Sequence, residues 1–459
     1  MYQIDFEKPS KIHFIGIGGI SMSGLAEILL SRGFVISGSD WHKSPLTDRL
    51  EQNGAVIYEG QTADHITEDM DAVVYTAAVH GDNAEYQRAV ELEIPLLSRA
   101  QLLGQMMKNY ETAIAVSGTH GKTTTTSMLA EILLKTEWDP TISVGGILPT
   151  IGGNIRIGHT GCMLTEACEY TNSFLDFYPT LAIILNVKED HLDFFKDLAD
   201  IRNSFRRFAK LVPAEGAVVI DTGIENYQEL VEGLACRVIT VGPAPESQYR
   251  VEDISFDTLD RAMFTVVTAD GERQPMMLHV PGAHNVENAL AAIAAARDMD
   301  ISWEQIRAGL DHFTGTNRRF QKKGQFHGVT VVDDYAHHPD EIEATLTAAK
   351  QMHYDKVWCV FQPHTYTRTK ALLPEFAEAL SLSDVVIMAK IYAARETDTL
   401  GVSSQTLADE ISKKGKEVYC FDSFDEIENF LLQFCTDGDL LITMGAGDIV
   451  NVGENLLGI

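Results

Sequence analysis

Residues Thr112–Thr126 read TAIAVSGTHGKTTTT, an apolar run that breaks into a glycine turn and continues as a lysine followed by four threonines. A strand that ends in a tight turn and opens a helix points several backbone N–H groups at one place. Those donors, with the positive end of the helix dipole, bind phosphate. Lys122 would supply a mobile positive charge for the outer phosphates, and the Thr123 hydroxyl is placed to hold a magnesium ion. This strand-turn-helix stretch therefore predicts a nucleotide-phosphate site.

The match to the phosphate-loop pattern G-x-x-x-x-G-K-[ST] is incomplete, because Val116 stands where the first glycine belongs. What remains is the shorter G-x-x-G-K-T from Gly118 to Thr123. An ordinary strand-to-helix turn is the alternative interpretation. Four β-branched residues open a helix poorly, however, and a fold seldom accepts that cost without a gain, which favours phosphate binding.

The composition is that of a soluble globular protein, with 45% hydrophobic and 22% charged residues. A length of 459 residues predicts about three domains. The net charge of −30 argues against a nucleic acid or an anionic membrane as partner. The first ten residues lack the apolar core of a signal peptide, and no uncharged run reaches the ~20 residues of a membrane helix. The six cysteines include no C-x-x-C pair, so a cytoplasmic, reduced protein is expected.

A second glycine-rich turn lies near the N-terminus, where Gly16–Gly24 reads GIGGISMSG after a strand-like segment. A further strand is expected at Phe34–Gly38, ending at Asp40. An acid 22 residues after Gly18 is typical of the dinucleotide fingerprint, in which it takes a ribose hydroxyl. Ser21 occupies the third glycine position, so the fingerprint is imperfect and, taken alone, a weak signal.

Alternating strand and helix patterns divide the chain into three expected domains, residues 1–107, 108–312 and 313–459. In the second, short apolar runs predict buried parallel strands, and the segments after Gly216 predict a mixed or antiparallel addition. In the third, helices separate the strands, which predicts a parallel sheet covered on both faces. The strands expected in these two domains, besides the one before Gly118, include 162–164, 181–185, 329–333, 356–361, 385–390, 417–421 and 440–444.

Polar groups follow two of the strands expected beside the phosphate loop. Glu166 comes after the apolar run CMLT, and His191 lies in NVKEDH after AIIL. Ligands bind at the carboxyl ends of parallel strands, and hard carboxylates beside a phosphate loop suit magnesium. A histidine is a less usual magnesium ligand, so His191 is expected to act through water or to serve a second ion. The alternative is that these are solvated loop ends in an acidic protein.

The third domain concentrates cationic and imidazole side chains in an otherwise acidic chain, namely Arg318, Arg319, His337, His338, His364 and Arg368. Charges from separate strand ends indicate an anionic ligand such as a phosphate or a carboxylate. An isolated histidine is more often a structural hydrogen bonder. The His-His-Pro sequence, however, sits at a strand-to-helix turn, where side chains face a cleft more often than a core.

These motifs together resemble those of the Mur ligases of peptidoglycan precursor synthesis, in that family's order and spacing over nearly the whole chain. The motifs are GTHGKTTTT, EACE, NVKEDHLD, PGAHNVENALAA, GTNRRF, DDYAHHPDEI and FQPHTYTRT. The resemblance implies an α/β protein of three domains. These are a Rossmann-like domain for a UDP-sugar, a central P-loop ATPase-type domain for ATP, and a C-terminal Rossmann-like domain for an amino acid. It also implies that the first glycine loop holds a uridine diphosphate instead of a dinucleotide.

The branch of the family that carries GIGGISMSGLAE, DYAHHP and QPHTYTRT implies a specific reaction. In it, an ATP- and Mg²⁺-dependent ligase joins L-alanine to the lactyl carboxylate of UDP-N-acetylmuramate, for cell-wall synthesis, cell shape and division. The carboxylate takes a phosphoryl group from ATP, and the free amine of L-alanine then expels phosphate from the acyl phosphate. Closure of the third domain over the central one is expected to exclude water.

Carried onto this sequence residue by residue, the resemblance assigns four groups of site residues. The residues expected to bind ATP, among which Lys122 is also catalytic, are Gly118, Thr119, His120, Gly121, Lys122, Thr123, Thr124, Asn285, Asn288, Arg318 and Asp333. The residues expected at the UDP-sugar are Gly16, Gly18, Gly19, Ser23 and Asp40. The amino acid is expected at Tyr335 and at the catalytic residues His337 and Arg368, which would supply the cation for its carboxylate. The expected metal ligands are Thr123, Glu166 and His191.

Two departures from the family pattern stand out. EACEYTN replaces the form EADESDA, so Cys168 and Thr171 receive no polar role, and Thr365 stands where some members carry an additional arginine. No lysine is assigned the carbamylated role found in sister ligases. The sequence carries no signal for the oligomeric state.

Three other functions compete with this interpretation. A recycling ligase that adds a preformed peptide to UDP-N-acetylmuramate also has the His-His-Pro motif, although PHTYTRT favours the alanine enzyme. A nicotinamide oxidoreductase explains Gly16–Asp40 but leaves Gly118–Thr126 unused. A non-catalytic nucleotide switch needs the phosphate loop but not the cationic third domain.

Overall fold

The computed structural model describes residues 2–192, 194–257, 261–394, 396–398 and 400–459, so Asp193 of the NVKEDHLD motif lies outside the described residues. Over this part of the chain the strands form three sheets, and the backbone divides into two compact units. The first unit is Met1–Glu189 with Asp197–Arg250 and Ala291–Gly309, and the second is Asp190–Lys196 with Val251–Leu290 and Leu310–Ile459. The domain limits at 107/108 and 312/313 stay predictions. Among the described residues, no helix is both long enough and apolar enough to cross a membrane.

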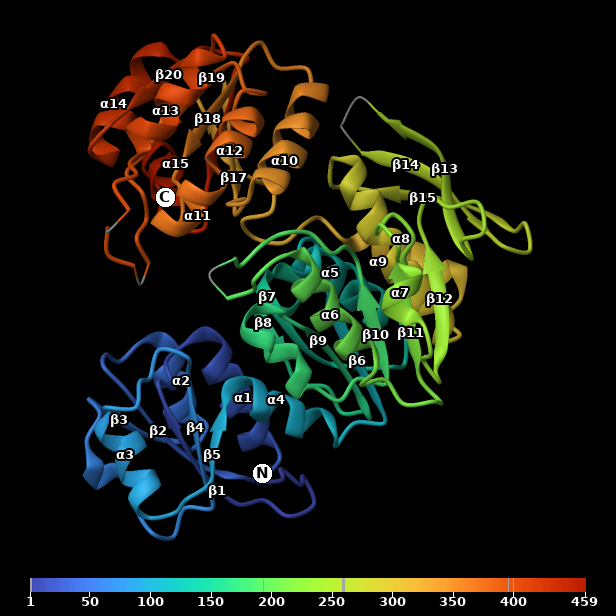
Figure 1. Ribbon diagram of the computed structural model, residues 1–459, viewed down its shortest axis with the longest axis vertical. Helices are drawn as coiled ribbons and strands as arrows, with labels where there is room; N and C mark the ends of the chain where they lie inside the picture. Colours follow the sequence, from blue (N-terminus) through green and yellow to red (C-terminus); the bar gives the residue numbers. More distant parts are fainter. Residues whose placement is uncertain (1, 193, 258–260, 395, 399) are drawn as a thin grey trace. The chain divides into compact units, whose positions relative to one another are not determined.

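The first sheet belongs to the first unit and is parallel, with strand order β3-β2-β1-β4-β5 (Figure 1, blue). Its central strands are short apolar runs with buried side chains, as in sheets covered by helices on both faces. Ile15 pairs with Ser39, so the turn after β1 and the end of β2 lie at the same edge. The elements are β1 (Lys11–Ile15), α1 (Ile20–Ser31), β2 (Val35–Asp40), α2 (Pro45–Gln52), β3 (Val56–Glu59), η1 (Ala63–His65), β4 (Ala72–Tyr75), α3 (Ala84–Glu91), β5 (Leu96–Ser98) and α4 (Arg99–Met107).

The second sheet has a parallel centre and antiparallel ends, in the order β15-β14-β13-β12-β11-β10-β6-β9-β7-β8. β6 lies between β10 and β9, and the parallel register pairs Ser117 with Ile184 and Val116 with Glu166. Glu166 is therefore the last residue of its strand and ends beside the start of the phosphate loop. The elements are β6 (Thr112–Ser117), α5 (Lys122–Leu133), β7 (Thr141–Leu148), η2 (Pro149–Ile151), β8 (Gly153–Arg156), β9 (Cys162–Glu166), η3 (Tyr170–Asp176), β10 (Leu181–Ile184), α6 (Leu198–Ala209), β11 (Ala217–Asp221), α7 (Gln228–Val231), β12 (Arg237–Val241), β13 (Tyr249–Phe256), β14 (Ala262–Thr268), β15 (Arg273–Leu278), α8 (Ala283–Asp298) and α9 (Trp303–His312).

The mixed addition expected after Gly216 is confirmed, because β11 and β12 pair in parallel while β14 and β15 pair antiparallel. Three strands of this sheet were not predicted. β7 and β8 pair antiparallel around a register shift in the glycine-containing segment TISVGGIL, and glycine inside a strand weakens its pattern. β13 reads YRVEDISF and is half-buried to exposed, so it lacks the apolar run of a buried strand.

The third sheet, in the second unit, has the order β16-β17-β21-β18-β19-β20 and contains all five strands expected there. The prediction of a parallel sheet is wrong at one edge, because β16 runs antiparallel to β17. The segment QKKGQF is lysine-rich and contains a glycine, as is typical of an edge strand and not of a buried one. The elements are β16 (Gln321–Phe326), β17 (Val329–Asp334), α10 (Pro339–Gln351), β18 (Val357–Phe361), α11 (Tyr366–Ala371), α12 (Leu373–Leu380), β19 (Val385–Met388), α13 (Ser404–Lys413), β20 (Glu417–Cys420), α14 (Phe424–Phe434), β21 (Leu440–Met444) and α15 (Val450–Leu457).

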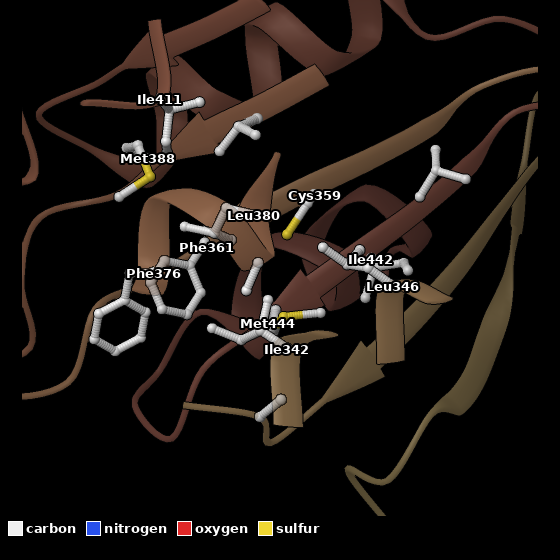
Figure 2. Close-up of a cluster of buried hydrophobic side chains, with 14 of the residues drawn as sticks. Ile342, Leu346, Cys359, Phe361, Phe376, Leu380, Met388, Ile411, Ile442 and Met444 are labelled. Carbon is white, nitrogen blue, oxygen red and sulfur yellow. The ribbon is translucent and has the colours of Figure 1, made fainter. Parts of the chain in front are cut away.

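The central strand β18 separates two apolar clusters on opposite faces of this sheet. Its residues VWCVF are all buried, and successive side chains of a strand point to opposite faces. Cys359 and Phe361 pack with side chains of α10, α12 and α13 (Figure 2), whereas Trp358 and Val360 pack with side chains of α14 and α15. The third sheet is therefore covered on both faces, as the sequence predicts.

Candidate functional site

The phosphate loop joins β6 to α5 in the first unit, and two glycines give it its shape. Gly118 has φ +145° and Gly121 has φ +84°, conformations that L side chains rarely adopt. A Cβ on Gly118 would also lie 2.9 Å from the Cβ of Leu185. Gly121 is the N-cap of α5, and no side chain of the described residues caps that end. The N–H groups of the first helical turn are therefore directed at a ligand position, as in an anion site.

The loop is held from β10 by Asn186, a residue that the sequence analysis did not assign. The backbone N–H of His120 donates to Oδ1 of Asn186 at 2.8 Å, and Nδ2 of Asn186 donates to the carbonyl of His120 at 3.1 Å. The backbone N–H of Lys188 donates to Oγ1 of Thr119 at 3.0 Å. Thr119 and His120 thus shape the loop, and Thr124 lies half-buried in the first turn of α5. The signal in the sequence was the position of Asn186, two residues after the strand that pairs with β6.

Lys122 starts α5 and bends back over the loop. Its Nζ lies 2.5 Å from the carbonyl oxygen of Gly118, 3.0 Å from that of Thr119 and 3.0 Å from Oε2 of Glu169. Burial alone would lower the pKa of Lys122, but the charge and hydrogen bond of Glu169, together with the charges of Cys168 and Glu166, outweigh it and raise the pKa to about 12. Lys122 is therefore a permanent cation at the loop.

Thr123 and Glu166 form a pair of oxygen donors beside this cation. Oγ1 of Thr123 donates to Oε2 of Glu166 at 3.1 Å, and the N–H of Gly145 donates to Oε1 at 2.5 Å. A Cβ on Gly145 would lie 2.7 Å from Glu166 Oε2, so a larger residue there would require the carboxylate to shift. A hydroxyl and a carboxylate beside a phosphate site are hard oxygen donors of the kind that Mg²⁺ binds, with phosphate and water completing its shell. The donor set therefore fits a magnesium ion.

The glycine loop after β1 is held by the end of β2. The N–H groups of Gly16 and Ile17 donate to the carbonyl of Ser39 at 2.8 and 3.0 Å, and the N–H of Gly18 donates to Oδ2 of Asp40 at 2.8 Å. Gly19 is the N-cap of α1, again with no side chain of the described residues capping the helix. Asp40 thus supports the loop backbone, and its predicted contact with the sugar nucleotide stays a prediction.

One of the residues predicted at this loop, Ser23, points into the protein. The contact between Ser21 and Arg99 at the loop was not predicted. Ser23 is buried and its hydroxyl donates to the carbonyl of Ile20 at 3.1 Å. Ser21, at the third glycine position, accepts from Nη1 of Arg99 at 3.3 Å. Arg99 begins α4, far away in the sequence, and brings a positive charge to the start of α1. The arrangement favours an anionic ligand such as a diphosphate.

A buried carboxylate, Glu85, lies under this loop. Its Oε2 accepts from Oγ of Ser39 at 2.5 Å and its Oε1 contacts Nδ1 of His65 at 2.6 Å, while Nε2 of His13 lies 3.5 Å from Oε2. Burial would raise the pKa of Glu85, but hydrogen bonds from His13 and Ser39 reverse the shift and lower it. Since Ser39 also holds Gly16, the cluster supports the loop from below.

The second unit contains the asparagines assigned to adenosine and the histidine assigned to a second ion. Nδ2 of Asn285 donates to the carbonyl of Pro281 at 2.7 Å, and Nδ2 of Asn288 donates to Oδ1 of Asn285 at 3.3 Å. His191 has φ +53°, and its Nε2 lies 3.7 Å from an oxygen of its neighbour Asp190. Glu166 belongs to the other unit, so shared binding of metal by Glu166 and His191 stays a prediction.

Arg318 and Asp333, the two nucleotide residues expected from the third region, pair with one another. Nε of Arg318 donates to Oδ2 of Asp333 at 3.0 Å, and Oγ1 of Thr443 donates to Oδ1 at 2.8 Å. Nη2 of Arg318 also donates to the carbonyl of Gly445 at 2.7 Å. Asp333 is fully buried, and burial raises its pKa despite the charge of Arg318. Both oxygens of Asp333 thus have partners inside the unit, and a ribose contact stays a prediction.

The residues assigned to the amino acid gather around Arg368 in the second unit. Nη2 of Arg368 lies 3.2 Å from Oδ1 of Asp190, and Nη1 lies 3.4 Å from Nδ1 of His364. The rings of His364 and His337 are 5.8 Å apart, and those of His337 and Tyr335 are 5.4 Å apart. Burial lowers the pKa of His337 to about 4. A low pKa favours the neutral form of His337 at neutral pH and leaves Arg368 as the cation of this pair, and the predicted role of His337 at the amino acid stays a prediction.

The pKa of His337 predicts a stability change with pH. A histidine whose pKa is about 4 when folded and 6.5 in its ordinary state binds fewer protons folded than unfolded. Its contribution to stability is complete above pH 6.5 and is lost as pH falls toward 4. As pH falls over that range, the free energy of unfolding should drop in both proteins. We expect the drop to be smaller in His337→Gln than in the wild type, by roughly 2–3 kcal/mol. Urea unfolding at several pH values measures this, with the exposed His353→Gln as control, and parallel curves for wild type and His337→Gln would contradict it.

The order of these features along the chain defines a class of protein. A glycine loop after β1, a phosphate loop with Lys122 and Glu166, and a C-terminal sheet with Arg318 and Arg368 in the segments beside it are features expected of a nucleotide-dependent ligase. Residues 11–111 match the Mur ligase family catalytic domain, residues 116–296 the Mur ligase middle domain and residues 318–447 the Mur ligase glutamate ligase domain. The chain belongs to the Mur ligase family.

Full-length relatives are similar along the entire chain. The UDP-N-acetylmuramate–L-alanine ligase of Lachnospira eligens is 58% identical over 458 residues, covering 100% of both chains. The ligase of the same name from Acetivibrio thermocellus is 50% identical and covers 100% of this chain and 98% of its own. Among solved structures, the UDP-N-acetylmuramate-alanine ligase of Thermotoga maritima matches with a TM-score of 0.81 and 30% identity, over 98% of each chain. A murein peptide ligase from Psychrobacter arcticus matches with a TM-score of 0.70 and 26% identity, also over 98% of each.

Proposed function

We propose that this chain is an ATP-dependent, ADP-forming ligase that joins L-alanine to the lactyl carboxylate of UDP-N-acetylmuramate, a step of peptidoglycan precursor synthesis in the cytoplasm. The observation that carries the assignment is the 58% identity over the full length to a ligase of that name. The phosphate loop, with Lys122 and the Thr123–Glu166 pair, supplies the chemistry that an ATP-dependent ligation needs.

Each group at the phosphate loop has a task in this reaction. ATP supplies the phosphoryl group that turns the unreactive carboxylate into an acyl phosphate, and Mg²⁺ neutralises charge on the phosphates. The N–H groups of the first turn of α5 and the ammonium of Lys122 bind and orient the phosphates and stabilise the charge that spreads during transfer. Thr123 and Glu166 would hold the metal. His191 would serve a second ion.

The amino acid is held by its carboxylate at Arg368, the cation of the second unit that lies among His364, His337 and Tyr335. Arg368 presents a planar fork of donors that matches a carboxylate. His337, which is neutral above its pKa of about 4, serves as a hydrogen-bonding group that orients the substrate. L-Alanine attacks as the free amine, and phosphate leaves.

The first glycine loop takes the uridine diphosphate of the substrate. We expect UDP-N-acetylmuramate to bind with micromolar-class affinity, roughly −8 kcal/mol, and NAD and NADP to give little response. Gly18→Ala places a Cβ 2.8 Å from Asp40 Oδ2, whereas Gly81 has open space around it. Isothermal titration should show affinity reduced by about tenfold or more in Gly18→Ala and unchanged in Gly81→Ala. Tight NAD binding without UDP-sugar binding would reverse the assignment of this loop.

A further inference from the structure

Glu169 is a buried carboxylate at the phosphate loop that the reaction described above leaves without a role. It stands three residues after Glu166 and is 2% exposed. Its two oxygens lie 3.0 and 3.3 Å from Nζ of Lys122. A carboxylate so far removed from water is found in proteins when it is paired, and here the partner is the lysine assigned to the phosphates.

The backbone fixes Glu169 in this position from both sides. On one side, the N–H of Ala167 donates to the carbonyl of Val116, in the strand that leads into the phosphate loop, at 2.8 Å. On the other side, Thr171 and Asn172 have φ +54° and +59°, a left-handed conformation that asparagine tolerates but that is unfavourable for a β-branched residue such as Thr171. Such strain persists only where the surroundings impose it.

An aromatic cluster provides that constraint. Phe174 is fully buried, stacks on Phe208 at 4.6 Å between ring centroids and meets Phe205 edge-on at 5.3 Å. The N–H of Phe174 donates to the carbonyl of Cys168 at 3.1 Å, which draws the chain into a tight turn directly after Glu169. The carboxylate is therefore aimed at Lys122 by packing and is not a mobile surface group.

All the hydrogen-bonding capacity of the Lys122 ammonium is used within the loop. An ammonium has three protons, and the carbonyl oxygens of Gly118 and Thr119 and the carboxylate of Glu169 lie at 2.5, 3.0 and 3.0 Å. To bind a phosphate oxygen, Lys122 must release or share one of these partners. Glu169 is the partner whose charge an incoming phosphate replaces, since the other two are neutral carbonyls of the loop itself.

We infer that Glu169 is a positioning residue that holds the Lys122 ammonium at the phosphate loop before nucleotide binds and competes with the outer phosphates of ATP for it. This inference rests on the proposed function of Lys122 as the phosphate-binding cation. A fixed anion in this place keeps the lysine oriented before the nucleotide arrives. It also opposes nucleotide binding, which favours release of ADP after the reaction.

The test compares Glu169→Gln with Glu137→Gln, which removes the same charge from an exposed position beyond the opposite end of α5. The first measurement is competitive acetylation of Lys122 at one fixed pH, read by mass spectrometry on nucleotide-free protein. Since a carboxylate oxygen of Glu169 lies 3.0 Å from the Nζ of Lys122, loss of this charge should free the lysine and raise its acetylation rate by about threefold or more. The second measurement is titration with Mg-ATP and Mg-ADP, whose dissociation constants should fall by roughly threefold or more because a like charge is removed. Glu137→Gln should change neither.

An unchanged Lys122 acetylation rate, or weaker nucleotide binding in Glu169→Gln, would overturn the inference and leave Glu169 a purely structural residue. Should Glu169→Gln not fold, wild-type protein provides the test, because Lys122 must acetylate more slowly than Lys135 and must be shielded further by Mg-ATP. Equal rates for the two lysines contradict the inference. The acetylation needs no nucleotide, so wild-type protein that ignores Mg-ATP but retains slow acetylation of Lys122 would refute the proposed function while leaving the pairing established.

Discussion

Replacing Lys122 with alanine is expected to lower the rate of ADP release by about a hundredfold or more. The ammonium lies at the phosphate loop, has a raised pKa, and is the group that we propose stabilises charge on the transferring phosphoryl. A steady-state coupled assay at saturating substrates measures the effect. The exposed Lys135→Ala, just after the same helix, should keep wild-type activity.

This experiment needs a second variant, because Lys122→Ala removes the cation that pairs with the buried carboxylate of Glu169. Removing one partner of a buried ion pair costs about 3–5 kcal/mol, so the single variant would lose stability as well as activity. The double variant Lys122→Ala/Glu169→Gln removes both charges and should recover much of that stability while remaining inactive. A folded double variant with near-normal ADP release would contradict the role of Lys122.

Replacing Glu166 with alanine is expected to raise the magnesium concentration for half-maximal activity by about tenfold or more, since a charged ligand is worth at least ~1.4 kcal/mol. Glu166 is held by Thr123 on one oxygen and by the backbone of Gly145 on the other. Glu166→Gln keeps the size and removes the charge, so it should shift the magnesium requirement in the same direction. Magnesium titrations of both variants, with the exposed Glu215→Ala as control, measure this. An unchanged requirement would make Glu166 a structural residue of the loop.

The phosphate loop could be predicted because its signal is local. Gly118, Gly121 and Lys122 are near neighbours in the chain, and their backbone conformation follows from residue type. Glu166 was also within reach, since the carboxyl ends of parallel strands share one edge and its strand is an apolar run. The structure adds the register, with Val116 opposite Glu166, which no composition rule supplies.

Other parts of the site were hidden because they depend on packing between distant segments. The pairing of Glu169 with Lys122 occurs beside a left-handed turn at Thr171 and Asn172, and the local sequence does not predict that turn. Arg99 reaches Ser21 from another helix, 78 positions away. The low pKa of His337 follows from burial, which the sequence alone does not reveal. Short-range patterns thus located the loops, whereas the charges around them were set by tertiary structure.

The central claim is the identity of the reaction, and ADP release measured with each substrate in turn tests it most directly. The account predicts that ADP appears only when Mg²⁺, ATP, UDP-N-acetylmuramate and a free amino acid are present together, with L-alanine the best amino acid. Selectivity over glycine and serine is expected to be modest, since one methylene is worth only ~1–3 kcal/mol. ADP release that ignores L-alanine and requires the peptide L-Ala-γ-D-Glu-diaminopimelate instead would contradict it and identify a recycling ligase.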